Sequence, residues 1–261
     1  MPGFFLVFLL ILVAISGSWI PTPNAKALIM LLLVAAVYRY RPMPVWQRVL
    51  CWLAMVPLAF WAATHRPEDF SYPLLLQLTN TDGAVTFSLY ANLAKGLVGI
   101  LLLALLWPAR REVDFRAPVS LRWLVLLASP LLIVGVAAPL LGLQWQPKLI
   151  EQIAIFAWAN LLLTCVAEEA FLRLLLQLPM IRVLQAWTQH RWLQEALPLL
   201  LVTVIFVLIH SGLSGAAIWV YGLAGFLYGL SYTLSKNVFF PIAVHCAVNL
   251  LHFSLLSYPG N

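Results

Sequence analysis

The chain has 261 residues, of which 63% are hydrophobic and only 9% are charged, and its mean hydropathy is +0.95. Because soluble domains carry about a quarter charged residues, this composition excludes an ordinary soluble protein and indicates a membrane protein with several spans. The net charge of +6 therefore does not point to nucleic acid, and we expect no nucleic-acid partner, since basic residues in membrane proteins mainly set orientation.

Nine apolar segments, taken in chain order, are candidates for membrane-spanning helices, because a span needs about 20 apolar residues. They cover residues 3–20, 25–38, 45–63, 87–107, 121–143, 151–177, 197–211, 214–235 and 238–257. The second and seventh segments are short, so eight spans are the alternative. We predict an all-α fold, a polytopic membrane helical bundle of about 8–9 transmembrane helices around a water-filled intramembrane cavity.

The connections between these segments indicate an orientation. Residues 64–86 hold acidic and aromatic side chains and are predicted to form an outer loop, whereas residues 107–120 form a basic, cytoplasmic loop. With the amino terminus in the cytoplasm, the inner loops hold most of the basic residues, as the positive-inside rule requires. The inner residues are Arg39, Arg41, Arg48, Arg110, Arg111, Arg116, Arg122, Arg182, Arg191 and Lys236, and the outer ones are Lys26, Arg66 and Lys148. The compact size favours a multi-pass protein of the bacterial inner membrane.

Three polar clusters lie inside predicted spans, where ionisable side chains are costly and are usually functional. They are EEAFLR from Glu168, FVLIH ending at His210, and HCAVN from His245. Lys95, in ANLAKGLVG, lies in the middle of the fourth predicted span. It either snorkels to the surface or faces the cavity, and the sequence does not decide between these two positions.

Helical geometry sorts the charged residues of the first cluster. Glu169 and Arg173 are four residues apart, so they share a face and can pair. Glu168 points about 100° away from Glu169 and is expected to be the freer carboxylate, able to act as a base.

The histidines offer complementary groups. His245 and Asn249 share a helical face and can donate hydrogen bonds to a developing oxyanion. His210 comes from another helix and can hold or deprotonate a water. Counted from the predicted inner ends, Glu168, His210 and His245 lie at similar depths, roughly 14–20 Å from the cytoplasmic side at about 1.5 Å per residue.

These motifs resemble those of the CAAX protease and bacteriocin-processing (CPBP) family, also called the Abi family, which includes the type II CAAX prenyl endopeptidases. EEAFLR matches EExxxR, FVLIH matches FxxxH and HCAVN matches HxxxN, in the same order and in separate spans. The segment GLAGFLYGLSYTLSKNVFFPIAVHCAVN is also similar to the ending of that family. The resemblance covers about residues 121–257. It implies an accessory transmembrane helical region, residues 1–120, and a protease core, residues 121–257.

The family is regarded as glutamic intramembrane peptidases, and the resemblance implies a role for each matching residue. Glu168 would activate a water with His210, while His245 and Asn249 would form the oxyanion hole. The supporting residues would be Glu169, Arg173 and Phe206. The implied reaction is endopeptidase cleavage near the C-terminus of a membrane-associated protein or peptide, with or without a lipid anchor, among membrane lipids and without a cofactor.

Several alternatives stay open. Glu168, Glu169, His210 and His245 are plausible zinc ligands by residue type, although the chain has no HExxH motif. Cys165 and Cys246 flank the motifs, but we expect both to be small buried apolar residues.

The pair Glu169–Arg173, taken alone, is also explained by helix packing. A non-catalytic membrane scaffold, a bacteriocin self-immunity protein or a transporter-like partner is the alternative function. An unpaired carboxylate at mid-bilayer argues against it, because a scaffold has no physical need for one. The sequence leaves the substrate and the oligomeric state open.

Overall fold

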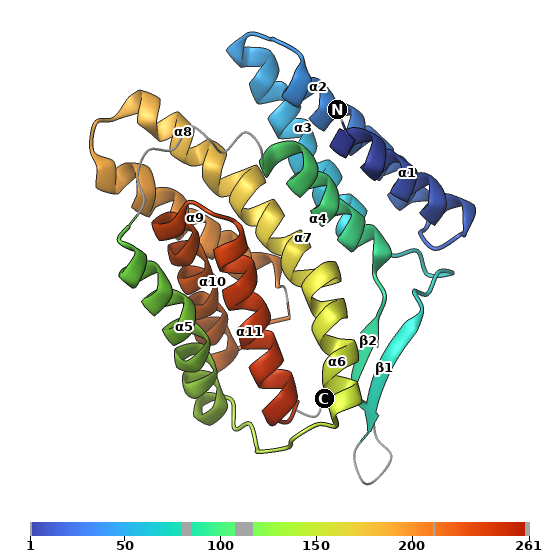
Figure 1. Cartoon of the computed structure of the whole chain (residues 1–261), viewed down its shortest axis with the longest axis vertical. Coiled ribbons are helices and arrows are strands. Elements are labelled where there is room, and N and C mark those ends of the chain that lie inside the picture. Colours follow the sequence, from blue (N-terminus) through green and yellow to red (C-terminus); the bar gives the residue numbers. More distant parts are fainter. Residues whose placement is uncertain (1, 80–84, 108–116, 211, 259–261) are drawn as a thin grey trace. The chain divides into compact units, whose positions relative to one another are not determined.

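The computed structural model describes residues 2–79, 85–107, 117–210 and 212–258 (Figure 1). The predicted basic loop at 107–120 lies largely outside these residues. The helices are α1 Pro2–Ser16, α2 Thr22–Tyr40, α3 Val45–Thr64, α4 Leu93–Leu106, α5 Val119–Leu140, α6 Ile150–Ala159, α7 Val166–Glu169, α8 Leu178–Trp187, α9 Arg191–Ile209, α10 Ala216–Ser235 and α11 Phe239–Leu255. Two π-helical segments, Asn160–Cys165 and Ala170–Gln177, join α6, α7 and α8 into one helical run.

The described chain is a helical membrane bundle, as predicted. Six of its helical segments are long and apolar enough to cross a membrane, and the helices at 3–16, 93–106 and 239–255 are shorter apolar ones. Each of the nine predicted segments contains a helix. The longest run, Ile150–Trp187, extends well beyond the predicted end at residue 177.

The prediction for the fourth segment is wrong at its start. Strands β1, Leu74–Thr79, and β2, Val85–Tyr90, pair as a two-stranded hairpin, so residues 87–90 are strand and not helix. The β-branched and aromatic residues of VTFSLY favour a strand, yet they are apolar enough to extend a hydropathy window. Helix α4 begins at Leu93, so Lys95 lies in its first turn and not in the middle of a span.

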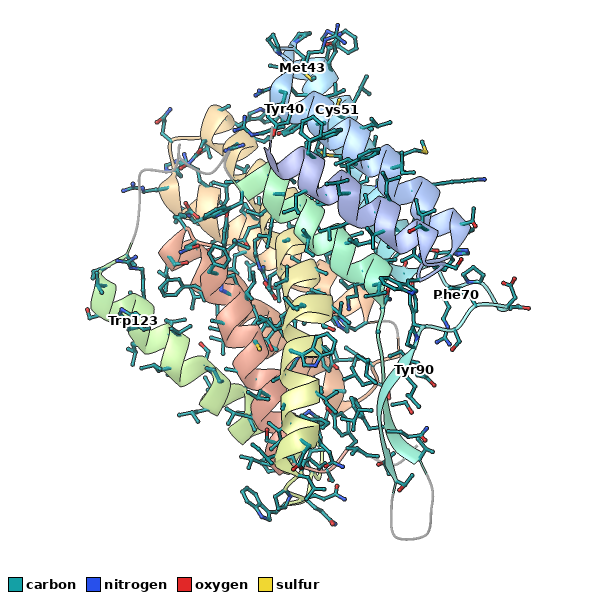
Figure 2. All side chains as sticks on the ribbon, turned by 45° about the vertical axis from the view of Figure 1, so that its right-hand side comes forward. Tyr40, Met43, Cys51, Phe70, Tyr90 and Trp123 are labelled. Atoms are coloured by element: carbon teal, nitrogen blue, oxygen red, sulfur yellow. The ribbon has the colours of Figure 1, made fainter. Side chains whose placement is uncertain are left out.

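The chain divides into two compact units, which we describe separately. The first contains the described residues within 1–73, 90–113 and 162–176. Helix α2 packs against α1, α3 and α4, and α4 also packs against α1, α3 and α7. Figure 2 shows Tyr40, Met43 and Cys51 at the end of the hairpin that α2 and α3 form.

Hydrogen bonds from polar side chains link separate segments of the first unit at two places. Asn24 is fully buried in α2 and donates hydrogen bonds to the carbonyl oxygens of Ala62 and His65, at 2.9 and 2.8 Å. These bonds satisfy carbonyls at the C-terminal end of α3, which have no partner within that helix. The Trp52 indole N–H donates to the carbonyl oxygen of Leu175 at 2.6 Å, which ties α3 to the segment that follows the first motif.

The second unit contains the described residues within 74–89, 114–161 and 177–261. Helix α10 packs against α5, α9 and α11, and α11 also packs against α5 and α6. An aromatic cluster made of Phe87, Phe156, Phe253 and Tyr258 joins β2, α6 and the end of α11. The Phe156 and Phe253 rings stack with their centres 4.1 Å apart. This cluster positions the helix that carries the third motif.

The two units do not coincide with the predicted division at residue 120. That division concerned an accessory region and a protease core, and it stays a prediction about function.

Candidate functional site

The first motif lies where the helix geometry changes. Helix α7, Val166–Glu169, is flanked on both sides by the π-helical segments Asn160–Cys165 and Ala170–Gln177. A π-helical turn contains more residues than an α-helical turn, and such turns occur frequently at functional sites. The first motif therefore begins at the end of a short α-helical turn and continues into a π-helical segment.

Glu169 and Arg173 form the predicted ion pair. The Arg173 Nε donates to Glu169 Oε2 at 2.8 Å, and both side chains are 0% exposed. Because an isolated charge in an apolar interior is very costly, each residue needs its partner. Removing one member of such a pair costs about 3–5 kcal/mol.

Glu168 is more exposed than Glu169 and does not pair with Arg173, as its position suggested, but it is not the unpaired carboxylate that the sequence analysis expected. The Lys95 Nζ lies 2.6 Å from Glu168 Oε1, and the two side chains are 25% and 15% exposed. The lysine comes from α4, 73 residues earlier in the chain. Spacing along one helix cannot reveal such a partner, and for this reason the prediction failed.

Two glycines bring α4 close enough for this contact. A Cβ on Gly99 would lie 2.7 Å from the Cα of Ala167, and one on Gly96 would lie 2.7 Å from a methyl of Leu163. Real Cβ atoms do not approach other atoms so closely. The absence of side chains at these two positions lets the backbone of α4 lie directly against the first motif.

In the second unit, His210 ends α9. Its Nδ1 lies 2.7 Å from the carbonyl oxygen of Phe206. A carbonyl oxygen only accepts hydrogen bonds, so Nδ1 carries the proton, and Nε2 is the acceptor in the neutral ring. This tautomer suits a residue that receives a proton from water.

Two tyrosines of α10 pack against the predicted catalytic histidines. The Tyr228 ring stacks on His245, with ring centres 4.5 Å apart and an angle of 16° between the planes. The Tyr221 ring lies 4.9 Å from His210. These tyrosines were missed by the sequence analysis, although their spacing of seven residues places them on one helical face.

Phe206 is the centre of this aromatic group. It is buried, and its ring centre lies 4.6 Å from that of His210 and 6.4 Å from that of His245. A Cβ on Gly225 would lie 2.7 Å from the Phe206 ring, so the small residue on α10 makes room for the aromatic residue of the second motif.

Asn249 is held by a second residue that the sequence analysis did not select. Its Nδ2 donates a hydrogen bond to Oδ1 of the buried Asn160 at 3.0 Å. Because an amide NH₂ has two N–H donors, this bond uses one of them and sets the plane of the group. The Asn160 amide also lies 3.9 Å from the Cys246 sulfur.

The structure thus groups the predicted residues in two sets. Within the first unit lie Glu168, Glu169 and Arg173, and within the second lie Phe206, His210, His245 and Asn249. In the described ranges, no group of three or more His, Cys, Asp or Glu side chains is placed to hold a metal ion. Cys165 is buried, Cys51 and Cys246 are partly buried, and none of the three is in a disulfide bond.

Comparison with known families identifies one match. Residues 150–251 match the family model described as type II CAAX prenyl endopeptidase Rce1-like. The comparisons with curated proteins and with solved structures found no match. The matched segment includes all three motifs, so the resemblance seen in the sequence is confirmed over these residues. It indicates a CAAX-type intramembrane protease in general terms.

Proposed function

We propose that this integral membrane protein, whose residues 150–251 are Rce1-like, is a glutamic endopeptidase. It cleaves a peptide bond near the C-terminus of a membrane-associated protein or peptide. The observation that carries the proposal is that the matched segment contains all three motifs. They follow one another in the same order as in the family that the sequence resembles.

In the proposed mechanism, a water molecule loses a proton to Glu168, assisted by His210. The water oxygen attacks the peptide carbonyl, and the resulting oxyanion accepts hydrogen bonds from His245 and Asn249. The leaving amine then takes the proton from Glu168. The Nδ1–H tautomer of His210 and the bond from Asn249 to Asn160 support these roles.

The finer assignments belong to the same proposal. The substrate is a CAAX-type protein or a peptide precursor, with or without a prenyl group. The amino terminus faces the cytoplasm of a bacterial cell. Glu169, Arg173 and Phe206 support the site, and residues 121–257 are the protease core.

A non-catalytic scaffold or self-immunity protein is the second candidate, and one observation favours it. An unpaired carboxylate at mid-bilayer would have argued strongly for catalysis, but Glu168 is paired with Lys95. Two ion pairs in one unit also suit a protein whose charges only fix the packing of its helices.

The test is the isosteric replacement Glu168→Gln. Full-length protein in proteoliposomes receives a farnesylated CAAX-type reporter peptide and its non-farnesylated twin. We expect Glu168→Gln to lower turnover about 1,000-fold or more while the protein stays folded, since general acid–base groups contribute about 10²–10⁴-fold. The matched control is Glu151→Gln, an exposed glutamate in the first turn of α6, which should keep full activity.

Near-normal turnover in Glu168→Gln, with cleavage by the wild type, would falsify the glutamate mechanism. Loss of wild-type activity with a chelator, and its return with zinc, would instead favour a zinc-dependent protease. A scaffold predicts no cleavage of either peptide and no new C-termini when the membrane proteomes of a deletion strain and its parent are compared.

A further inference from the structure

We propose that Lys95 is a positioning residue of the protease, which holds Glu168 as a carboxylate and keeps the charge of the site balanced during the reaction. This inference rests on the proposed function. Lys95 lies outside the matched residues 150–251, so the region predicted to be accessory would supply part of the catalytic machinery.

The contact itself is direct. A distance of 2.6 Å between Lys95 Nζ and Glu168 Oε1 is that of a strong, charge-assisted hydrogen bond. The Glu168 side chain keeps 15% of its surface exposed, whereas the neighbouring Glu169–Arg173 pair is completely buried. The Lys95–Glu168 pair is therefore the less buried of the two ion pairs, and the one with surface left for another molecule to contact.

The backbone around Lys95 is fixed by a helix cap and by close helix packing. The Asn92 Oδ1 accepts a hydrogen bond from the Lys95 backbone N–H at 3.0 Å and caps α4 at this turn. Gly96 and Gly99 then hold α4 against residues 163 and 167. A lysine that only needed water would extend to the membrane surface. Lys95 instead extends to a carboxylate on the helix that its own helix packs against.

The charge balance gives the pair a role in each step. Before attack, Lys95 is cationic and Glu168 anionic. During attack, an O–H bond of water breaks, its proton bonds to Glu168, a C–O bond forms, and the carbonyl π pair becomes a lone pair on the oxyanion. Glu168 is then neutral and the negative charge lies on the intermediate, so the sum of these charges stays zero, whereas without Lys95 it would stay at −1. When the amine takes the proton and leaves, the pair re-forms.

The neutrality of the site matters because a net charge is costly where the dielectric constant is low. Without Lys95, the resting site would hold an uncompensated carboxylate. Glu168 would then tend to take up a proton before water binds, and a protonated glutamate cannot act as the base. Lys95 needs no contact with the substrate to act in this way.

The experiment compares Lys95→Met with Lys95→Arg in the proteoliposome assay with the two reporter peptides. We expect Lys95→Met to lower kcat about 100-fold, with KM within about 3-fold, the size of effect seen on losing one preorganised electrostatic group. Lys95→Arg keeps the positive charge and should retain kcat within about 10-fold. The control Lys26→Met removes an exposed lysine of α2 and should leave kcat unchanged.

The pH dependence of kcat separates positioning from packing. If Lys95 acts through Glu168, the curve for Lys95→Met changes shape, because the ionisation of the base is altered. A packing defect lowers every point by the same factor. Lys95→Gln is the second variant in case Lys95→Met loses its cooperative thermal unfolding.

Wild-type kcat in Lys95→Met or Lys95→Gln would overturn the inference. Equal losses in Lys95→Met and Lys95→Arg with an unchanged pH curve would assign the residue to packing and would also overturn it. If Glu168→Gln is inactive while Lys95→Met is active, the proposed function stands and only the role of Lys95 fails. If Glu168→Gln is as active as the wild type, the proposed function fails first.

Discussion

The two units of the protein stabilise the polar residues of their motifs by different means. In the first unit these groups are charged, and each motif carboxylate has a cation beside it: Lys95 for Glu168 and Arg173 for Glu169. In the second unit the groups are histidines and amides, and aromatic rings and hydrogen bonds orient them, as with Tyr228 on His245 and Asn160 on Asn249. A charge in an apolar interior needs a counter-ion, whereas a neutral group needs only a fixed direction. Substitutions of motif residues should therefore be most damaging to stability in the first unit.

The largest expected effect is the loss of one member of the fully buried ion pair. Arg173→Met should lower the free energy of unfolding by about 3–5 kcal/mol, because Glu169 is left as an uncompensated buried charge. Chemical denaturation in detergent measures this. The double variant Glu169→Gln, Arg173→Met should be less destabilised than Arg173→Met alone, since no charge remains.

Arg48→Met is the control for this prediction. Arg48 is exposed and lies over the Tyr38 ring at 5.8 Å, and its loss should cost less than about 1 kcal/mol. An equally small effect for Arg173→Met would show that the buried charges of the first unit do not depend on their partners.

The next effect concerns the close approach of α4 to the first motif. In Gly99→Ala the new Cβ would lie 2.7 Å from the Ala167 Cα, a backbone atom, so the helices must separate. We expect about 1–3 kcal/mol of destabilisation and a fall in kcat, because Lys95 moves away from Glu168. Denaturation and the peptide assay measure both.

Gly222→Ala provides the comparison in the second unit, because nothing lies within 4 Å of the added Cβ. It should be neutral or slightly stabilising, since alanine favours a helix by about 1 kcal/mol over glycine. If both alanine variants behave alike, the contact at Gly99 is not restrictive and the argument for a built lysine site weakens.

The smallest effect is expected in the second unit. Tyr228→Leu removes the ring that stacks on His245 and should lower kcat about 10-fold, in line with the roughly 0.5–1.5 kcal/mol of an aromatic pair. Tyr228→Phe keeps the ring and should stay within about 2-fold of wild type if stacking is the role. A loss in Tyr228→Phe as large as in Tyr228→Leu would instead assign the role to the hydroxyl group.

The sequence predicted those features that depend on residues close together in the chain. Hydropathy located a helix in each of nine segments, and helical spacing predicted the pair Glu169–Arg173, because both partners lie on one turn. The motifs predicted a family resemblance over about residues 121–257, and the family match covers residues 150–251 of that range. In each of these cases the physical cause, burial of an apolar run or a spacing of four residues, is local.

The features that the sequence analysis missed depend on residues that are distant in the chain. The partner of Glu168 is 73 residues away, and the rings against His210 and His245 come from a different helix. The start of α4 was misplaced because the apolar strand β2 resembles the start of a span when only hydropathy is counted.

The sequence by itself therefore determined the class of protein, the approximate helices and the identity of the polar residues placed in lipid. Tertiary structure decided which of those residues are paired and how they are oriented. The reason is that the cost of a charge in an apolar interior depends on what lies within a few ångströms of it in space. For Glu168 that neighbour is Lys95. Two glycines let α4 pack closely beside the first motif, and this packing makes an apparently unpaired carboxylate one member of an ion pair.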